Sequence, residues 1–575
     1  MRLSFEFKKV VLVVSMGFLA FSSWGCVGGD RIELAEYRIA SDVQTTLSRV
    51  VSLDAVPQTA AAVYPYEIWK FEQDGYGTWH YGPGMPHEKR LDLMPASYDA
   101  ASAGHAARLL NFFAITDIHI SDKESPCQAI YYGYKGGISS GYSPVMLYTT
   151  HVLDAAVQTV NALHKTNPFD FGISLGDTCN DTQYNELRWY IDVLDGKNIN
   201  PDSGVKDDPV PGPHNDYQDA YKAVGLDTTI PWYQALGNHD HFYIGSVPVN
   251  DYLRQTYTGD EIVRLGTFQQ LFYDPDGVNK RDYSMGAVDG RTVYGDIYGA
   301  GTSMDFPTPV KALAADTNRR SLTRNEWIAE FFNSSSSPAG HGFPREAIET
   351  GFACYTFEPK ADVPLRVIVL DDTQRADDVF FQGYGHGSLD AERYAWLMAQ
   401  LEKGQADGKL MIIAAHIPIG VRPAGALDGW WAKACVTEQE LFATLHSYPN
   451  LILWIAGHRH VNTVTAFPSP DPARPELGFW QVETSSLRDY PQQFRMFEIV
   501  RNSDDTVSIL TTDVDPAVAD GSPAATSRAY SVAAQQLFRN ELDPAPNGSY
   551  NAELVIRLSP EMQAKIRNIG TPLRK

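Results

Sequence analysis

The stretch "LILWIAGHRH" at residues 451–460 is an apolar run that ends at a glycine and is followed by two histidines one residue apart. A short run with no polar residue predicts a β-strand that is buried on both faces. Polar groups at the end of such a strand are typical of open α/β sheets, which gather the carboxyl ends of successive strands around one site. The stretch therefore predicts a fold class and the place of a site within it.

Five other stretches of the chain repeat this pattern, each joining a short apolar run to aspartate, asparagine or histidine. They are "NFFAITDIH" (111–119), "FGISLGDTCND" (171–181), "IPWYQALGNHD" (230–240), "LRVIVLDD" (365–372) and "LMIIAAHIP" (410–418). Because the carboxyl ends of parallel strands meet at one edge of a sheet, we expect these polar groups to form a single constellation on an α/β scaffold.

The side chains at these strand ends are carboxylates, imidazoles and an amide, with no thiolate among the candidates. This donor set favours Mn, Fe, Zn or Co and argues against a structural zinc bound by cysteines. Seven ligands are too many for one ion and predict two divalent metal ions that share a carboxylate, an arrangement suited to displacement at phosphorus. The candidate ligands are Asp117, His119, Asp177, Asn238, His416, His458 and His460.

Residue spacing predicts how these side chains point. In an extended chain residues i and i+2 face the same side, which would direct Asp117 with His119, and His458 with His460, toward one place. Arg459 would then point away. A glycine precedes three of the clusters, where a turn must bring the main chain close to the site. These glycines are Gly176, Gly237 and Gly457.

Five motifs in this order resemble the calcineurin-like metallophosphoesterase superfamily, and specifically an exported bacterial subfamily of it. They are D-x-H at 117–119, G-D at 176–177, G-N-H-D at 237–240, the strand-end histidine at 416 and G-H-x-H at 457–460. The resemblance implies an α/β fold, a four-layer αββα sandwich of two mixed β-sheets with a dinuclear metal site at strand ends. It also implies a phosphoester hydrolase, either a phosphomonoesterase or a phosphodiesterase.

The resemblance assigns a role to each motif residue. The first metal would bind Asp117, His119, Asp177 and His460, and the second Asp177, Asn238, His416 and His458. A bridging hydroxide would attack phosphorus in line while His239 protonates the leaving group. In several members an aspartate three residues after the bridging carboxylate supports this histidine. Here that position is asparagine, so the candidates for orienting His239 are Asn180, Asp181 and Asp240.

Other polar residues near the motifs are weaker candidates for function. His241, His386 and Arg459 are candidate substrate contacts, each with a structural alternative. The carboxylates at 371–372 are interpreted as turn formers, and the arginines at 319–320 as a solvated helix start. The substrate, the choice between monoester and diester, and the identity of the metals stay open.

The N-terminal residues predict export from the cell. "MRLSFEFKK" is basic, Val10 to Phe21 is nearly all apolar, and small residues precede Cys26. This pattern resembles a bacterial lipoprotein signal peptide over 1–26, with Cys26 as the lipidation site, and the apolar run is too short to span a bilayer. Ser23 departs from the lipoprotein pattern, so ordinary cleavage is the alternative. We expect a periplasmic or cell-envelope protein whose mature chain has no transmembrane helix.

The rest of the chain is expected to form one large catalytic region with additions. We predict an N-terminal irregular segment at 27–107, a metallophosphoesterase domain at 108–515 with an insertion at about 242–362, and a C-terminal extension at 516–575. The net charge of -23, without a Lys/Arg-rich run, argues against a nucleic-acid binding surface. The alternative function is a non-catalytic exported binding protein that keeps the scaffold.

Overall fold

The computed structural model describes residues 34–56, 63, 68–128, 144–204, 219–263, 285–288, 297–301, 314–375, 385–423, 426, 428–538 and 547–573. The chain divides into two units, Met1–Glu33 and Leu34–Lys575, and all described residues belong to the second. The signal peptide predicted at 1–26, with Cys26, lies outside the described residues. Among the described helices, none combines the length and the apolar character that a membrane span requires.

One sheet has six strands in the order β11-β12-β13-β14-β16-β15. The central strands β12, β13, β14 and β16 run parallel, and the two edge strands pair antiparallel with their neighbours. In the order of the sheet, the strands are β11 (Tyr355–Phe357), β12 (Leu365–Val369), β13 (Leu410–Ala414), β14 (Leu451–Ala456), β16 (Phe479–Glu483) and β15 (Thr463–Phe467).

The other sheet has eight strands, in the order β3-β19-β18-β17-β4-β5-β8, with β20 pairing with β4. Strands β4, β5 and β8 are parallel, while β17 joins β4 in the antiparallel direction. Residues 27–107 contribute β3, and residues 516–575 contribute β19 and β20. The strands are β3 (Glu88–Arg90), β19 (Ala552–Ile556), β18 (Val507–Val514), β17 (Phe494–Asn502), β4 (His105–Ile115), β5 (Phe171–Ser174), β8 (Trp232–Gln234) and β20 (Thr571–Pro572).

The two sheets pack face to face around the main hydrophobic core. Val367, Ile412 and Leu453 of the six-stranded sheet lie in the same buried cluster as Phe497 and Ile509 of the eight-stranded sheet. Because successive side chains of a strand point to opposite faces, the intervening residues of the same strands must be covered from the other side. Both faces are therefore buried, which explains the continuous apolar runs in the sequence.

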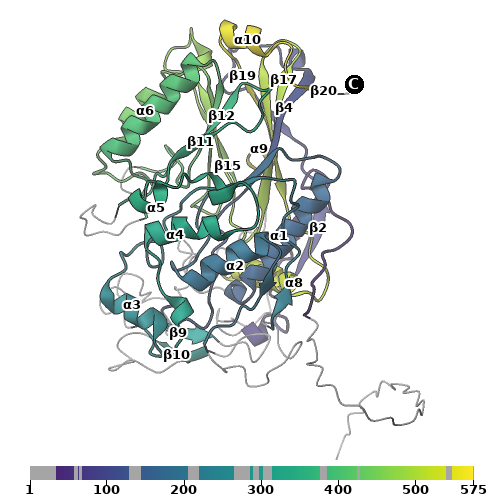
Figure 1. Ribbon diagram of the computed structural model, residues 1–575. Coiled ribbons are helices and arrows are strands. Elements are labelled where there is room, and N and C mark those ends of the chain that lie inside the picture. Colours follow the sequence, from purple (N-terminus) through teal and green to yellow (C-terminus); the bar gives the residue numbers. More distant parts are fainter. Residues whose placement is uncertain are drawn as a thin grey trace, which may run out of the picture. The chain divides into compact units, whose positions relative to one another are not determined.

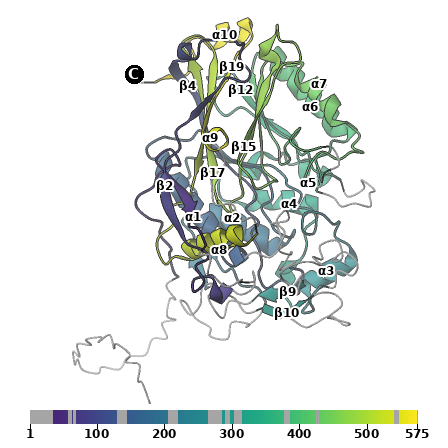
Figure 2. The same cartoon turned by 180° about the vertical axis from the view of Figure 1, so that it is seen from behind.

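Helices cover the outer face of the six-stranded sheet. Ile368, Ile413 and Trp454 form a second buried cluster on this face. Helices α6 (Ala391–Ala406) and α7 (Glu438–Leu445) add leucines to the cluster. Figure 2 shows both helices along this side of the sheet. The apolar residues on opposite faces of β12, β13 and β14 thus belong to different cores.

Helices α1 (Thr149–His164), α2 (Tyr184–Leu194) and α8 (Pro523–Phe538) gather on the other side of the structure. Leu153 and Val157 of α1 join the core that contains the eight-stranded sheet. Figures 1 and 2 both show α1 and α8 on the side away from α6. The fold is therefore an α/β sandwich with two mixed sheets between layers of helices, as the sequence predicts.

The remaining described elements are short. Three strand pairs are β1 (Arg49–Leu53) with β2 (Trp79–Pro83), β6 (Asn198–Ile199) with β7 (Tyr221–Lys222), and β9 (Met285–Val288) with β10 (Ile297–Gly301). The α-helices are α3 (Asp251–Thr258), α4 (Arg324–Glu330), α5 (Ala347–Thr350), α9 (Asn547–Tyr550) and α10 (Pro560–Ile566). The 3₁₀ helices are η1 (Ile68–Lys70), η2 (Ala100–Ser102), η3 (Pro144–Tyr148), η5 (Thr317–Arg319), η6 (Phe331–Asn333), η7 (Ala339–Gly342) and η8 (Pro475–Leu477).

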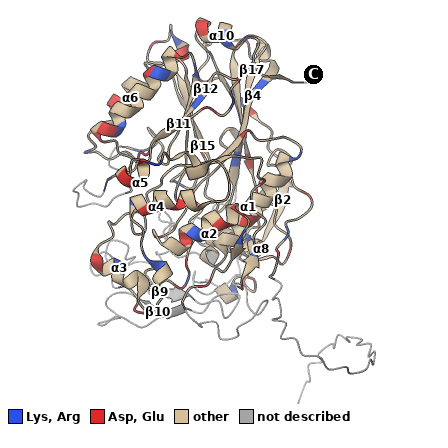
Figure 3. Cartoon of the chain, viewed as in Figure 1, with Lys and Arg blue, Asp and Glu red and all other residues tan. Residues whose placement is uncertain are grey.

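Acidic and basic residues are both distributed along the described elements (Figure 3). Figure 3 shows residues of both signs on α6, in whose sequence Glu402 precedes Lys403. The four cysteines of this unit are free thiols: Cys127, Cys179, Cys354 and Cys435. The first three are buried and the last is exposed.

Candidate metal centre

The seven candidate ligands lie just beyond the carboxyl ends of parallel strands from both sheets. These strands are β4, β5 and β8 in one sheet and β13 and β14 in the other. Asp117 and His119 follow β4, Asp177 follows β5, Asn238 follows β8, His416 follows β13, and His458 and His460 follow β14. All are buried except His458, which is half-buried.

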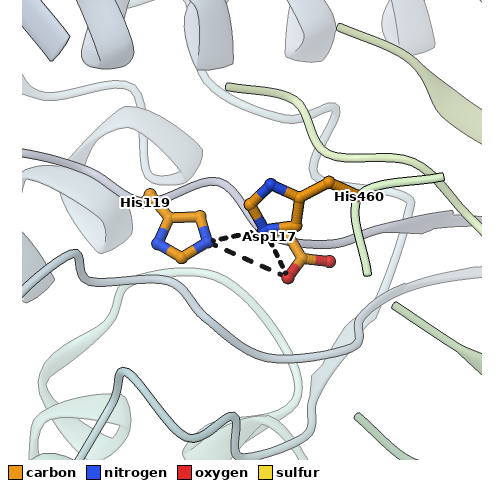
Figure 4. A group of neighbouring side chains, drawn as sticks. All are labelled: Asp117, His119 and His460. Atoms are coloured by element: carbon orange, nitrogen blue, oxygen red, sulfur yellow. Dashed lines mark hydrogen bonds and ion pairs between the residues drawn. The ribbon is translucent and has the colours of Figure 1, made fainter. Parts of the chain in front are cut away.

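One group of donors consists of Asp117, His119 and His460, whose ligand atoms lie within 4.8 Å of one another. The Nε2 atoms of His119 and His460 are 3.1 Å apart, and Oδ1 of Asp117 is 3.2 Å from Nε2 of His460. Figure 4 shows the three side chains pointing toward a common centre. These residues come from two different sheets, so the packing of the sheets brings the group together.

A second group consists of Asp177, His416 and His458. Oδ2 of Asp177 is 3.2 Å from Nε2 of His416. The amide oxygen of Asn238 lies 2.9 Å from the same His416 nitrogen and 3.1 Å from Nδ1 of His458. The amide therefore adds a fourth oxygen or nitrogen donor to this group.

Asp177 connects the two groups. Its Oδ2 atom is 3.6 Å from Nε2 of His119 and 3.2 Å from Nε2 of His416. His119, Asp177 and His239 also form a third set of donors within 4.8 Å. One carboxylate thus faces both the first and the second group, which is the position that a bridging ligand occupies in a two-metal site.

The buried carboxylates of the site favour positive charge on the groups beside them. Burial lowers the pKa of a histidine, but at His416 the carboxylates of Asp177, Asp117 and Asp372 together outweigh this effect and raise the pKa to about 10. At His460 the carboxylates of Asp117 and Asp489 together outweigh burial and raise the pKa to about 9. Burial raises the pKa values of Asp117 and Asp177, yet the neighbouring histidines hold both below the usual range. In the metal-free protein, protons on two histidines thus offset two buried carboxylates.

The donor set fits divalent metal ions. Oδ1 of Asp117 has the ion pair with His460 at 3.2 Å, and Nε2 of His458 is buried without a hydrogen-bond partner among the described residues, so both atoms are available to a cation. The donors are imidazole nitrogens, carboxylate oxygens and one amide oxygen, which suit first-row divalent ions. Cations at this position would replace the protons that the histidines carry in the metal-free protein.

The main chain at the ligands is not extended, which corrects the expectation from residue spacing. Asp117 and His119 have φ values of 50° and 47°, Asp177 has 51°, and His458 and His460 have 70° and 56°. All five lie in the left-handed region, which non-glycine residues seldom adopt and which costs of order 1–3 kcal/mol each. The ligands share one centre because the strands have ended and the chain turns sharply, not because it continues as a strand.

Two of the glycines that precede the clusters are needed for close packing at the site. A Cβ atom at Gly237 would lie 2.2 Å from both the amide nitrogen and Oδ1 of Asp177. At Gly457 it would lie 2.0 Å from Oγ1 of Thr116 and 2.4 Å from Oδ2 of Asp117. Any side chain at either position would displace a candidate ligand, which confirms the predicted close approach of the main chain.

His239 lies against the ligands with a defined tautomer. Its Nδ1 atom donates to the main-chain carbonyl of Asn180 at 2.7 Å, and its amide donates to Oδ1 of Asp177 at 2.8 Å. The ring packs edge to face on His119 with centroids 4.5 Å apart. Because a carbonyl oxygen only accepts hydrogen bonds, Nδ1 carries a hydrogen and Nε2 is left to exchange a proton. Burial keeps the pKa of His239 below its usual value.

The three candidates for orienting His239 have different positions. The contact comes from the main chain of Asn180, not from its side chain. Oδ1 of Asp181 accepts from the amide of Ile244 at 2.8 Å. Asp240 accepts from the amides of Asp177 at 3.0 Å and of Thr178 at 2.9 Å, so it holds the loop that carries the shared carboxylate.

The candidate substrate contacts are engaged by neighbouring residues. Arg459 donates two hydrogen bonds to the carboxylate of Glu483, at 2.6 Å and 2.8 Å. Nε2 of His241 lies 3.0 Å from Oγ1 of Thr373, and His386 is buried. Their contact with a substrate stays a prediction.

Sequence reasoning missed residues that support the ligands. Oδ2 of Asp489 lies 2.6 Å from Nδ1 of His460. Asp372, interpreted from the sequence as a turn former, accepts at 3.2 Å from the amide of His416. Nδ1 of His416 donates to the carbonyl of Leu175 at 2.9 Å. Asp372 could have been predicted as a candidate because it follows a buried strand. Asp489 lies well beyond the last motif and belongs to no motif, so residue type alone did not indicate it.

Other residues interpreted as structural form buried ion pairs. Asp371 pairs with Arg324 at 2.6 Å and with Arg393 at 3.2 Å. Arg319 is fully buried and pairs with Asp122 at 3.3 Å, so it is not the solvated helix start expected from the sequence. A buried guanidinium needs a carboxylate partner, and the pair links the 242–362 insertion to the loop after β4.

Comparisons with known proteins identify distant structural likenesses only. No family model matches the chain, and no curated protein matches it. Among solved structures, a dimetal phosphatase from Danio rerio is similar at 12% sequence identity and a TM-score of 0.37. That match covers 72% of this chain and 100% of the other. Membership of the metallophosphoesterase superfamily stays a prediction from the motifs.

Proposed function

We propose that this chain is a phosphoester hydrolase that uses two divalent metal ions. The observation that carries the proposal is the carboxylate of Asp177, which faces two separate groups of nitrogen and oxygen donors. Two ions that share one carboxylate are suited to displacement at phosphorus. The first would be held by Asp117, His119, Asp177 and His460, and the second by Asp177, Asn238, His416 and His458.

Metal ions at these positions would supply Lewis acidity, which activates the attacking water and offsets charge on the phosphoryl oxygens. His239 supplies the proton for the leaving group. The oxygen of water forms a bond to phosphorus and gives up a proton to solvent, while the ester P–O bond breaks and the departing oxygen takes a proton from Nε2 of His239, which then regains a proton from solvent. The hydrogen bond from Nδ1 to the Asn180 carbonyl supports this role, because it leaves Nε2 as the atom that exchanges protons.

The N-terminal sequence adds a location to the proposal. The basic start, the short apolar run and Cys26 lead us to propose an exported protein of the periplasm or cell envelope. Lipid attachment at Cys26 and ordinary cleavage remain alternatives. Growth of cells that express the protein with a radioactive fatty acid distinguishes the two alternatives. A lipidated protein should incorporate the label, and the Cys26→Ser variant should not.

The central test is hydrolysis by protein stripped of metal and reloaded singly with Mn, Fe, Zn or Co, on aryl phosphomonoesters and diesters. We expect metal-dependent turnover that Asp177→Asn and His239→Ala abolish. His239→Ala should keep both metals by elemental analysis, because this side chain is a proton donor in the proposal. Asp407→Asn, a substitution in a surface ion pair, is the control and should leave turnover unchanged.

Two outcomes would contradict the proposal. Turnover that persists after metal removal would show that the donor groups do not act through metal ions. Two bound metals without turnover on any ester would instead favour an exported binding protein that keeps the scaffold without the chemistry. The mono- and diester arms of the panel decide the substrate class if turnover is found.

A further inference from the structure

A short segment after β16, at 486–489, contacts the candidate metal centre at three points. Oγ of Ser486 donates to the main-chain carbonyl of Asp117 at 2.7 Å. Asp489 contacts the far nitrogen of His460. Between them Arg488 is 1% exposed, and its Nη1 atom donates to Oδ1 of Asn180 at 2.7 Å. The segment thus reaches both a ligand and the residue that holds the proton donor.

Asn180 is fixed by hydrogen bonds at each of its polar groups. Its Oδ1 atom accepts from Arg488 at 2.7 Å, and its Nδ2 atom donates to Oε1 of Gln128 at 3.0 Å. Its amide donates to the carbonyl of Ile120 at 3.0 Å, and its own carbonyl accepts from Nδ1 of His239 at 2.7 Å. The residue is 2% exposed, so water does not replace a lost partner easily.

We propose that Arg488 is a positioning residue for protonation of the leaving group, acting through Asn180 on His239. This inference rests on the proposed function. Removal of the guanidinium leaves the buried Oδ1 of Asn180 without its donor, an unfavourable state that the amide relieves by moving. Movement of Asn180 shifts the carbonyl that holds His239, and small misplacements of a reacting group cause large losses of rate.

The proposal differs measurably from direct binding of the substrate phosphate by Arg488. A displaced proton donor matters only when the leaving group needs a proton. A dinitrophenolate departs without one, whereas phenolate and alkoxide depart poorly unless they are protonated. A lost phosphate contact would instead slow all esters by a similar factor and act mainly on KM.

The kinetic test compares aryl esters of increasing leaving-group basicity in the metal-loaded enzyme. For Arg488→Ala we expect kcat to fall about 10²-fold on the phenyl ester and less than about 10-fold on the dinitrophenyl ester, which is the pattern expected for His239→Ala. Arg488→Lys keeps a donor for Asn180 and should recover part of the loss. Equal losses on all esters, or a change confined to KM, would overturn the proposal.

A second readout needs no turnover. In zinc-loaded protein with ¹⁵N-labelled histidine, the Nδ1–H of His239 should give a slowly exchanging signal that His239→Ala removes and thereby assigns. We expect this signal in the native chain and in Arg488→Lys, and its broadening by exchange in Arg488→Ala. An unchanged signal in Arg488→Ala would refute the positioning role. A native enzyme that hydrolyses no ester would refute the proposed function, while the signal would still decide the role of Arg488.

Two further variants guard against a general loss of folding. Arg528→Ala removes another buried arginine, which donates to the carbonyl of Pro516, and it should lower stability without a dependence on the leaving group. Asn180→Ala keeps the carbonyl but loses the amide contacts with Arg488 and Gln128. Asn180→Ala should reproduce the larger loss of kcat on the phenyl ester than on the dinitrophenyl ester. In the double variant with Arg488→Ala, the increase in activation free energy should be smaller than the sum of the two single increases. Additive losses would overturn the proposal.

Discussion

Replacement of Asp489 by asparagine tests how much a charge outside the ligand set contributes to metal binding. The carboxylate lies 2.6 Å from Nδ1 of His460, and the side chains of the two residues are only 15% and 7% exposed. A carboxylate on the far nitrogen of a histidine ligand fixes the ring and increases the basicity of the ligating nitrogen. Asparagine keeps the shape and an acceptor oxygen but removes the charge, so its effect isolates the electrostatic part.

We expect Asp489→Asn to weaken the metal site of His460 about 10-fold and Asp489→Ala about 100-fold. These factors correspond to about 1.4 and 2.7 kcal/mol of binding free energy. The other site should change little, because its histidine His416 donates to the carbonyl of Leu175. Competition of the metal-free protein with a chromophoric chelator for zinc gives two stepwise constants, and only one of them should fall.

The control for this measurement is Asp407→Asn, since this carboxylate is 38% exposed and pairs with Lys403 at the surface. It should leave both constants unchanged. Binding of both metals by Asp489→Ala as tightly as by the native chain would show that this carboxylate does not support the ligand. A parallel loss at both sites with a large fall in Tm would show that the residue acts on folding and not on the ligand.

Two further predictions concern the packing and the protonation of the site. A Cβ atom at Gly245 would lie 2.2 Å from the ring of His239, so Gly245→Ala should lower kcat about 100-fold. The control is Gly521→Ala, because Gly521 has a similar φ of +74° but no atom within 4 Å of the added Cβ. This substitution should lower Tm without affecting kcat. A similar loss of kcat would show that backbone strain, not the clash, is responsible. Metal added at pH 7 should displace about two protons, because the pKa values of His416 and His460 are about 10 and 9 and their ligating nitrogens must be free. These raised values stabilise the metal-free fold below the unfolded pKa, and that contribution disappears as the pH rises through 9 to 10. An indicator dye in weak buffer measures the release, and a value near zero at pH 7 would contradict the protonation states.

Much of the fold was predictable because burial leaves a direct trace in residue type. Val367, Ile412 and Leu453 face the core between the sheets, while their neighbours face the helices, so each strand is apolar throughout. In a folded chain, a continuous apolar run of this length is typical of a strand that is covered on both faces. The polar residues at the ends of these runs then predicted the edge where the ligands meet, while the two sheets were implied by the resemblance of the five motifs to a known superfamily.

The expected directions of the ligand side chains were wrong because the alternation of side chains in a strand does not continue past the end of the strand. β4 ends at Ile115, and Asp117 lies in a turn with φ of 50°. Aspartate and histidine adopt left-handed backbone more often than most other non-glycine residues, but residue type alone does not fix it. It is imposed by the packing of neighbouring loops, where Gly237 and Gly457 let the main chain approach the carboxylates.

The sequence by itself determined the chemistry that this protein carries: carboxylates, imidazoles and an amide at strand ends, because ligand type is a property of each side chain. Only the tertiary structure decided which groups hold those side chains in place. The carbonyl of Asn180 holds His239, and every residue has such a carbonyl, so residue type carries no signal for it. Asp489 and Arg488 reach the site through contacts between distant parts of the chain. Such contacts depend on how the two sheets pack, which local periodicity does not report.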